Sequence, residues 1–465
     1  MNTKMIRYIL CRMLGVEAVL LMIPVIVAAL YQEMSGIAFL IPAGILLLLF
    51  FLAGVKKPEQ SHIYGKEGMV IVALAWILWS LFGAMPFTIS GFIPNYMDAF
   101  FETVSGFTTT GSSILRDWIG GMGVLVFVLV LTSLDKKNSM YLMRAEVPGP
   151  EKDKLVPKAM STARILYGMY LIMTVVEIIF LMLGGVNLFD SMIFSFGSAG
   201  TGGFSNYADS VAHFHSAYID GVITTFCALF GVNFSLFYFM LLGDFKSVRK
   251  NEELRTYIML IVGATALITL NIHSMFPSMI KAFRYAIFQV VTVITTTGYA
   301  TTDFAKWPMF SKSILMMLTV VGACASSTGG GIKVSRLLVG IKCIKREIVQ
   351  LAHPKSVGII RIGGKKVGSD ILRTIYIYFI AYVGILIVSV MLVSLDNFDF
   401  ETTFSAVLTT LGNVGPGMAK VGPMGNFADF SILSKLVLCF DMLAGRLEIF
   451  PFLVLFTAPA WRRKF

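Results

Sequence analysis

The sequence predicts an all-α polytopic membrane protein with four tandem helix–pore-loop–helix repeats around a central pore, preceded by two extra N-terminal transmembrane helices. Hydrophobic residues make up 56% of the 465-residue chain and charged residues only 14%, against about 25% charged residues in a soluble protein. Apolar runs long enough to cross the ~30 Å hydrocarbon core recur along the whole chain. Four short Gly- and Thr-rich segments lie between pairs of these runs. Together these observations give the fold class.

Ten apolar runs give the expected order of elements. The first run is too long for the apolar region of a cleavable signal and lacks a small-x-small cleavage site, so we predict that it remains as a helix. The predicted spans cover residues 5–30, 37–55, 68–90, 118–134, 163–184, 218–243, 256–272, 311–341, 372–395 and 431–458. They divide the chain into an N-terminal two-helix segment (1–60) and four repeats (61–140, 141–250, 251–350 and 351–465), the third with an interrupted second helix.

The net charge of +11 is concentrated on one side of these spans. With the N-terminus inside, about 28 of the 38 lysines and arginines fall in cytoplasmic segments, as the positive-inside rule requires. Both termini are therefore expected in the cytoplasm. Because the excess charge is mainly an orientation signal, we expect the lipid bilayer as a partner and no nucleic acid.

Two of the short segments are close copies of each other. Residues 101–111 read FETVSGFTTTG and residues 288–298 read FQVVTVITTTG, so both contain the whole TTTG run. Two weaker copies, SAGTGGFS at 198–205 and TLGNVGPG at 410–417, centre on Gly202 and Gly415. Each follows an apolar stretch of about ten residues, which is too short to span a bilayer but suits a re-entrant helix. All four lie on the outer side in the topology that the charge predicts.

Such loops contain the residue types that a pore for a monovalent cation needs. A dehydrated cation must regain oxygen ligands, and rings of backbone carbonyls supply them. Glycine reaches the backbone conformations that turn carbonyls toward a pore, and the negative end of each re-entrant helix would face the cation path. One TTTG alone would indicate only a Thr-rich helix end, whereas four correctly placed copies favour a cation filter.

The eighth span is interrupted by a small, polar stretch, GACASSTGGG at 322–331. Consecutive glycines each cost a helix about 1 kcal/mol, so we expect a break there. Either the small residues serve close helix packing, or the break forms a flexible loop that crosses the pore beneath the filter and can block it.

Arg446 lies in the middle of the last span, where a charge is costly and indicates a function. Asp441 and Glu448 do not lie squarely on its helical face. We therefore expect its partners on other elements, such as the carbonyls of the broken loop. A purely structural ion pair within the membrane is the alternative.

With these motifs the chain resembles the TrkH/KtrB family of K⁺ uptake proteins over essentially its whole length. The motifs are TTTG at 108–111 and 295–298, WIGGMG at 118–123, GTGGFS at 200–205, SSTGGGIK at 326–333, NVGPG at 413–417 and GRLEI at 445–449. Two spans before the first repeat favour the TrkH branch. The resemblance implies K⁺ uptake across the cytoplasmic membrane of a bacterium, with K⁺ as the transported ion and no cofactor in this chain.

The resemblance also implies roles for particular residues. The filter would comprise Thr109, Thr110, Gly111, Thr201, Gly202, Thr296, Thr297, Gly298, Asn413, Val414 and Gly415, with K⁺ at Thr110, Thr201, Thr297 and Val414. The gate would comprise Gly322, Ser326, Ser327, Thr328, Gly329, Gly330, Gly331, Lys333 and Arg446.

Family members form homodimers and associate with a cytoplasmic nucleotide-binding regulatory subunit of the TrkA or KtrA type. Basic loops such as RAEVPGP at 144–150 are candidate contacts for that subunit. This chain has no GxGxxG fingerprint of its own.

Two features depart from fourfold symmetry. Only six residues separate Gly111 from Trp118, against roughly fifteen between filter glycine and next span in the other repeats. We expect low or altered conductance as a consequence.

The second departure is electrostatic. Asp98, Asp190 and Glu401 lie near the N-termini of their re-entrant helices, where acids are favoured. The third repeat has Arg284 there, so we expect a lopsided potential at the outer mouth.

Symport coupled to H⁺ or Na⁺ stays open as the alternative to a channel-like mode. Coupled transporters often place acids at the bilayer midplane, but Glu17, Glu177 and Asp441, the acids well inside spans, lie outside the filter segments. By the resemblance, glycine at all four filter positions disfavours a Na⁺-preferring protein. An enzyme is disfavoured because the spans contain no nucleophile–base pair or His/Asp metal cluster, and five scattered cysteines form no metal or disulfide motif.

Overall fold

The computed structural model confirms an all-α architecture, with one small hairpin in addition. It describes residues 2–30, 32, 34–59, 65–115, 159–355, 358–363 and 365–461. The predicted span 118–134, the WIGGMG motif, the basic loop 144–150 and the end of the short linker after Gly111 lie outside the described residues. The hairpin pairs β1 (Arg361–Ile362) with β2 (Lys365–Lys366) in antiparallel register.

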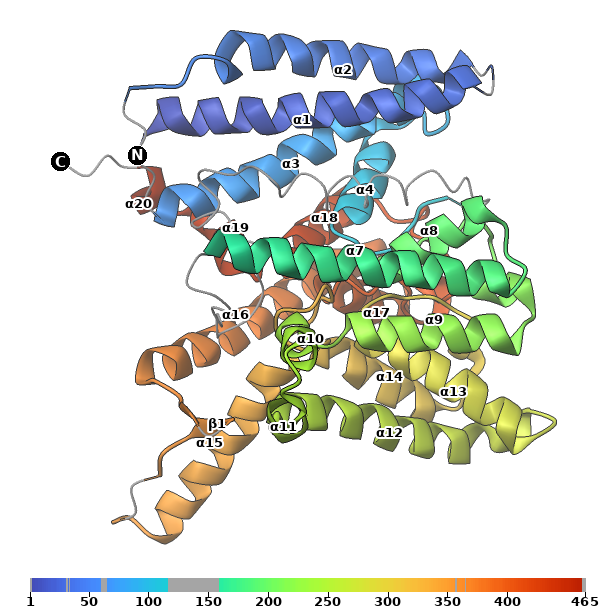
Figure 1. Cartoon of the computed structure of the whole chain (residues 1–465), viewed down its shortest axis with the longest axis vertical. Helices are drawn as coiled ribbons and strands as arrows, with labels where there is room; N and C mark the ends of the chain where they lie inside the picture. The colour runs from blue at the N-terminus through green and yellow to red at the C-terminus, as the bar shows by residue number, and fades with distance from the viewer. Residues whose placement is uncertain are drawn as a thin grey trace.

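Two N-terminal helices form a pair at the edge of the molecule (Figure 1). They are α1 (Thr3–Leu30) and α2 (Ile37–Leu49), the latter extended by a π-helical turn over Phe50–Gly54. Helix α3 (Gly65–Ile89) lies between this pair and the remaining helices (Figure 1). The indole of Trp79 in α3 donates a hydrogen bond to the carbonyl of Met13 in α1, at 3.4 Å.

Four short helices lie inside the bundle, one in each predicted repeat, and we call them the pore helices. They are α4 (Tyr96–Phe107), α8 (Leu188–Ala199), α13 (Met279–Ile294) and α17 (Phe400–Leu411). Each begins at a side chain that accepts a hydrogen bond from the first turn, namely Asn95, Asn187, Ser278 and Asp399. Three of them have twelve residues and α13 has sixteen, which gives lengths of about 18 and about 24 Å. None is long enough to cross a ~30 Å hydrocarbon core, as expected of re-entrant helices.

The remaining elements flank the pore helices. The longer helices are α7 (Ala159–Leu183), α9 (Ala217–Phe230), α12 (Glu252–Ile272), α14 (Met309–Val321), α15 (Val334–Ala352), α16 (Ser369–Val393) and α18 (Ile432–Arg446). The shorter ones are α10 (Phe234–Leu241), α11 (Phe245–Lys250), α19 (Phe450–Leu453) and α20 (Ala458–Trp461). Single 3₁₀ turns occupy Met34–Gly36, Ser210–Phe214, His273–Met275, Phe304–Lys306, Ser394–Asp396, Ala419–Val421 and Val454–Phe456.

The predicted continuous span over 218–243 is wrong. Helices α9 and α10 meet at a bend of 93°, and the segment between them contains Gly231 and Asn233. The Asn233 side chain caps α10 by accepting from the Ser235 amide at 3.0 Å. The Gly231 carbonyl accepts instead from the Cys324 amide at 3.0 Å. The break therefore exists because this backbone binds a different element, which an apolar sequence pattern does not reveal.

The last predicted span, 431–458, is also divided. Helix α18 ends at Arg446, and Glu448 and Ile449 adopt positive φ of 53° and 66° before the short α19 begins. The expected break in the eighth span is confirmed, because α14 ends at Val321 and α15 begins only at Val334. Within the described residues, six helices are long and apolar enough to cross a membrane, and α9 with α10 makes a seventh candidate.

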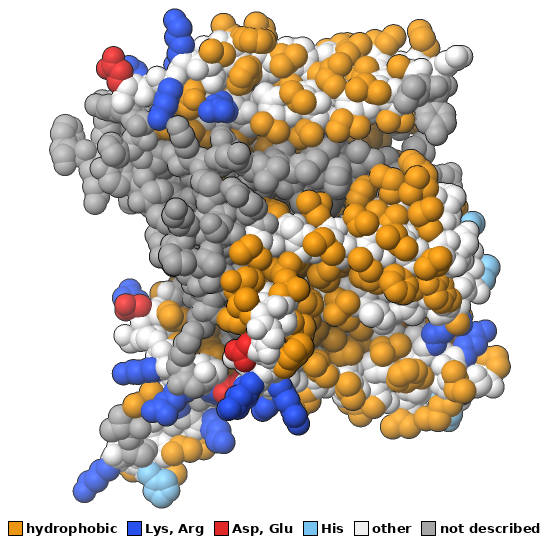
Figure 2. Space-filling model, viewed as in Figure 1, with side chains coloured by type: hydrophobic (Ala, Val, Ile, Leu, Met, Phe, Trp, Pro, Cys, Tyr) orange, Lys and Arg blue, Asp and Glu red, His pale blue; other side chains and the backbone are white. Residues whose placement is uncertain are grey.

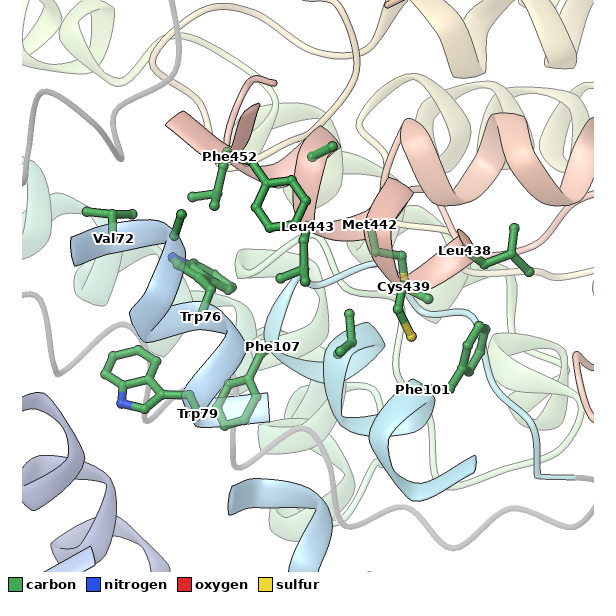
Figure 3. Packing of buried hydrophobic residues seen from close by; sticks show 14 of the residues in the cluster. Val72, Trp76, Trp79, Phe101, Phe107, Leu438, Cys439, Met442, Leu443 and Phe452 are labelled. Carbon is green, nitrogen blue, oxygen red and sulfur yellow. The ribbon is translucent and has the colours of Figure 1, made fainter. Parts of the chain in front are cut away.

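The first and fourth repeats share one buried apolar cluster (Figure 3). Trp76 and Trp79 from α3 and Phe107 from α4 lie beside Met442 and Leu443 from α18 (Figure 3). A second cluster joins α8, α9, α12 and α13. Because lipid is as apolar as these side chains, close packing rather than exclusion of water holds such helices together.

The surface is divided between an apolar band and a basic end. Apolar side chains cover the middle of the visible face over α1, α2, α7 and α12, whereas Lys and Arg gather mainly at the left, where both termini lie (Figures 1 and 2). Exposed apolar residues include Ile172, Phe180, Met259 and Val262. A chain with such a band is stable only when lipid covers it.

Candidate ion pathway

The loops after the four pore helices share one backbone path. Each contains a left-handed residue directly after the C-cap residue of the helix: Thr109, Thr201, Thr296 and Asn413, with φ of 53°, 54°, 59° and 54°. Two residues later each contains a glycine of positive φ: Gly111, Gly203, Gly298 and Gly415, at 80°, 64°, 82° and 96°. The left-handed conformation costs a threonine about 1–2 kcal/mol, so its fourfold recurrence indicates a common structural constraint.

This register corrects the prediction for the second repeat. The glycine equivalent to Gly111, Gly298 and Gly415 is Gly203, and Gly202 takes the position held by Thr110, Thr297 and Val414. The Gly202 amide donates to the Gly197 carbonyl at 2.8 Å, as the Thr297 amide donates to Thr292 at 2.8 Å. The carbonyl position predicted at Thr201 therefore moves to Gly202. Counting glycines put the centre one residue too early, because two adjacent glycines look alike in a sequence.

The four equivalent glycines, which are the candidate filter glycines, and four carbonyls make a closed ring. A Cβ atom on any of these glycines would lie less than 3.0 Å from a carbonyl oxygen of another repeat. The pairs are Gly111 with Gly202, Gly203 with Thr297, Gly298 with Val414, and Gly415 with Thr110. Each contact joins one repeat to the next, and the last returns to the first. The repeats therefore surround one axis, with four backbone carbonyls at one level.

Hydrogen bonds between threonine side chains stabilise the loops after the pore helices. Thr108 and Thr110 share a hydrogen bond of 2.7 Å, and Thr295 and Thr297 share one of 2.8 Å. The Asn413 side-chain amide donates to the Thr110 hydroxyl at 2.9 Å and so links the fourth repeat to the first. These hydroxyls are engaged with protein atoms, which fixes the carbonyls beside them.

The broken segment between α14 and α15 lies against the side of this ring where the left-handed residues Thr201 and Thr296 stand. We call this side the inner end of the ring. The Gly330 amide donates to the Thr296 hydroxyl at 2.6 Å, and the Thr201 hydroxyl donates to the Thr328 carbonyl at 3.2 Å. A Cβ on Gly329 would meet the Thr295 carbonyl at 2.7 Å. Close approach to the filter, more than flexibility, therefore explains the glycine run.

Several hydrogen bonds hold this segment in place. The Glu253 carboxylate accepts from the Ala325 amide at 2.7 Å, and the buried Lys333 ammonium donates to the Gly329 carbonyl. Ser327 donates to the Cys324 carbonyl at 2.6 Å, and the Ser326 carbonyl accepts from the Phe234 amide at 3.3 Å. At the start of the segment, Gly322 has a φ of 72° and closes against Gly331.

Arg446 reaches the same segment from α18. Its guanidinium donates to the Thr328 carbonyl at 3.1 Å and lies 5.9 Å from the centre of the Trp76 ring. The expected partner on another element is therefore present. Glu448 pairs instead with Arg336 of α15 at 2.6 Å.

Sequence reasoning missed Glu253 and the Arg336–Glu448 pair. Glu253 in the first turn of α12 looked like an ordinary favourable acid at a helix start. Arg336 and Glu448 are 112 residues apart, and no local pattern connects them.

Three pore helices are tied by ion pairs to the second helix of the preceding repeat. Asp98 of α4 pairs with Lys435 of α18 at 2.6 Å, and Glu401 of α17 pairs with Lys312 of α14 at 2.6 Å. Arg284 of α13 pairs with Asp220 of α9 at 3.2 Å. In the third repeat the pore helix carries the basic residue and the preceding helix the acidic one, the reverse of the other two pairs. Because Asp220 neutralises Arg284 locally, the expected asymmetry of the potential at the outer mouth is reduced.

The second pore helix uses its own loop instead. Asp190 accepts hydrogen bonds from the Asn206 side chain and, at 2.6 Å, from the Tyr207 hydroxyl. This bond, more than burial, raises the pKa of Tyr207 to about 12.

The acids well inside the predicted spans, Glu17, Glu177 and Asp441, are all buried. Asp441 accepts from the Ser389 hydroxyl at 2.7 Å. The Glu17 carboxylate has no hydrogen-bond partner among the described residues, and Glu177 lies beside Ser198 at the end of α8. None of the three is hydrogen-bonded to a described filter residue.

Comparison with known proteins identifies the family to which this architecture belongs. A family model described as TrkH, cation transport protein, matches residues 43–462. The Trk system potassium uptake proteins TrkH of Salmonella typhimurium and Escherichia coli K12 are 35% and 34% identical, each over 95% of this chain and 96% of its relative. The crystal structure of the potassium transporter TrkH from Vibrio parahaemolyticus superposes with a TM-score of 0.88 at 30% identity, covering 99% of this chain and 100% of that one. The chain therefore belongs to the TrkH family of cation transport proteins.

Proposed function

We propose that this chain carries K⁺ into a bacterial cell across the cytoplasmic membrane. The observation that supports the proposal best is the closed ring of Thr110, Gly202, Thr297 and Val414 carbonyls against four glycines. Backbone carbonyls in a ring replace the hydration shell of a monovalent cation without requiring a charged side chain. Its relatives are named as potassium uptake proteins.

The broken segment is proposed as the gate, with Arg446 as its counterpart. Residues 326–331 lie against the inner end of the ring through Thr201 and Thr296. An arginine beneath a cation filter repels the ion, and its bond to Thr328 holds the segment across the path. In this proposal, opening requires the segment to lose its bonds to Thr201 and Thr296 and its bond to Arg446.

Coupled symport with H⁺ or Na⁺ is the second candidate. Buried acids such as Glu177 are the residues that a proton pathway would use. None of them is hydrogen-bonded to a described residue of the ring, which favours the uncoupled, channel-like mode. Dependence of the reversal potential on pH or Na⁺ would establish coupling, whereas a potential set by K⁺ alone supports a channel.

The proposed assembly is a homodimer in the lipid bilayer with a cytoplasmic nucleotide-binding regulatory subunit. Both termini face the cytoplasm in this proposal, and the gathering of Lys and Arg at the end where the termini lie supports that orientation (Figure 2). Neither a cofactor nor nucleic acid is required.

Uptake of radioactive Rb⁺ into liposomes that contain the purified protein tests the proposal. We expect uptake driven by an outward K⁺ gradient and competed by K⁺ far better than by Na⁺. Gly415→Ser places a side chain against the Thr110 carbonyl, and should reduce this discrimination at least about tenfold. Unchanged discrimination in a folded Gly415→Ser protein would overturn the filter assignment.

A further inference from the structure

Glu102 is a buried carboxylate directly behind the first filter segment. It lies in α4, nine residues before Gly111, and is 3% exposed. Its carboxylate accepts from the Ser113 hydroxyl at 3.0 and 3.1 Å and from the Ile114 amide at 2.9 Å. The pore helix is thereby bound to the backbone that leaves the filter.

That backbone is in turn joined to the fourth repeat. The Ser113 carbonyl accepts from the Phe427 amide at 2.8 Å, and the Ser112 hydroxyl donates to the Gly415 carbonyl at 3.3 Å. Displacement of residues 112–114 would therefore move two of the four filter segments. Glu102 is the only side chain among the described residues that hydrogen-bonds both Ser113 and Ile114.

Each of the other repeats also joins its pore helix to the segment after the filter glycine. Gln289 holds the position of Glu102, nine residues before Gly298, whereas Ser405 and Asp190 lie ten and thirteen residues before Gly415 and Gly203. In the third repeat Gln289 donates to Thr301 at 3.4 Å. In the fourth, the Ser405 hydroxyl accepts from the Met418 amide at 2.9 Å. The second repeat uses Asp190 with Asn206 and Tyr207. A side-chain link from the pore helix to the segment after the filter glycine thus occurs in all four repeats, and in the first repeat a carboxylate binds both a hydroxyl and a backbone amide.

We propose that Glu102 is a positioning residue for ion selection, which holds the first filter segment, and through it Gly415, at the spacing that favours K⁺. This inference rests on the filter proposed above. A carboxylate is suited to the task because it only accepts hydrogen bonds, and both of its partners present donors. An apolar side chain of similar size leaves the buried Ile114 amide without an acceptor.

Three variants test the inference by the ratio of K⁺ to Na⁺ in competition with radioactive Rb⁺ uptake. Glu102→Leu should lower the ratio at least about tenfold, and Ser113→Ala about threefold. Glu102→Gln, which copies the third repeat and keeps an acceptor for Ile114, should remain within about threefold of the parent. The exposed cytoplasmic Glu347→Leu is the control for replacing an acid by leucine.

A double variant distinguishes loss of the Glu102–Ser113 contact from a general loss of stability. If Glu102 acts through Ser113, Glu102→Leu with Ser113→Ala should be no worse than Glu102→Leu alone. If Glu102→Leu does not fold, Ser113→Ala and Glu102→Gln still give the expected order. A parent-like ratio in folded Glu102→Leu or Ser113→Ala overturns the brace, provided that Gly415→Ser alters the ratio. If Gly415→Ser also has no effect, the filter itself is wrongly assigned.

Discussion

At the residue scale, a threonine or asparagine stands in the left-handed conformation at the base of each filter segment. The hydroxyls of Thr201 and Thr296 then bind the broken segment, while Asn413 binds Thr110 and the Met442 carbonyl at 2.9 Å each. Strain of about 1–2 kcal/mol per site persists because the neighbouring contacts determine the backbone on both sides.

The register of the second repeat gives a residue-scale prediction. At Gly203 a Cβ meets the Thr297 carbonyl on a left-handed backbone, and no side-chain rotation relieves that conflict. At Gly202 a Cβ meets the Phe204 ring at 2.8 Å, which can shift. Gly203→Ala should therefore reduce discrimination between Rb⁺ and Na⁺ at least about tenfold, and Gly202→Ala by less. The opposite order would return the filter position to Gly202.

Sequence and structure differ at this repeat for a definite reason. The TTTG runs of the first and third repeats, and Gly415, which has no glycine directly beside it, fix their own register. In the second repeat Gly202 and Gly203 are equivalent as letters, and only the left-handed Thr201 distinguishes them. Backbone conformation of a threonine is set by tertiary contacts, so no sequence pattern could give it.

At the element scale, the pairing between pore helices and preceding helices yields a second prediction. Asp220 is 6% exposed and Arg284 30%. Removing Arg284 leaves a nearly buried carboxylate unpaired, so Arg284→Ala should lower the unfolding free energy by about 3 kcal/mol. Thermal unfolding in detergent measures the change.

Charge reversal supplies the control for this pair. Asp220→Arg together with Arg284→Asp reproduces the polarity of the other repeats and should recover most of the lost stability. Lys306→Ala removes a lysine that is 79% exposed, and should change stability by less than about 1 kcal/mol. Equal losses in the reversed double variant and the single variant would show that the pair does not act as a unit.

The broken segment supports a third prediction. Arg446→Gln removes the charge and weakens the bond to the Thr328 carbonyl, so the closed arrangement loses a charge-assisted contact worth about 1.5–3 kcal/mol. The open fraction in planar bilayer recordings should rise at least about tenfold. Arg373→Gln, at an exposed position in α16, should leave the open fraction unchanged. A parent-like open fraction in Arg446→Gln would exclude a gating role.

Elements differ in how far their sequences predict them. Pore helices were predictable because ten-residue apolar stretches end at glycine-rich loops. The division of 218–243 was not, since Gly231 and Asn233 break the helix only because Cys324 and Ser235 bind there. Likewise Arg284 looked anomalous until Asp220, 64 residues earlier in the sequence, was found beside it.

At the scale of the whole molecule, the N-terminal pair is peripheral. Helices α1 and α2 pack mainly on each other and on α3, away from the pore helices (Figure 1). Deletion of residues 2–57 should lower the melting temperature, because Trp79 and its neighbours lose their cover. The preference for K⁺ over Na⁺ should not change. A changed preference would show that these helices support the filter directly.

The ring of glycines and carbonyls also limits how such a chain can evolve. The repeats differ in the residues at their helix starts, in the chemistry of their braces and in where their helices break. At the ring, each glycine is enclosed by the backbone of the neighbouring repeat. A side chain added in one repeat would therefore collide with a carbonyl of the next. Residues outside the ring can change in one repeat without changes in the others. The four glycines of the ring can be kept only together, because each fits against the backbone of the next repeat.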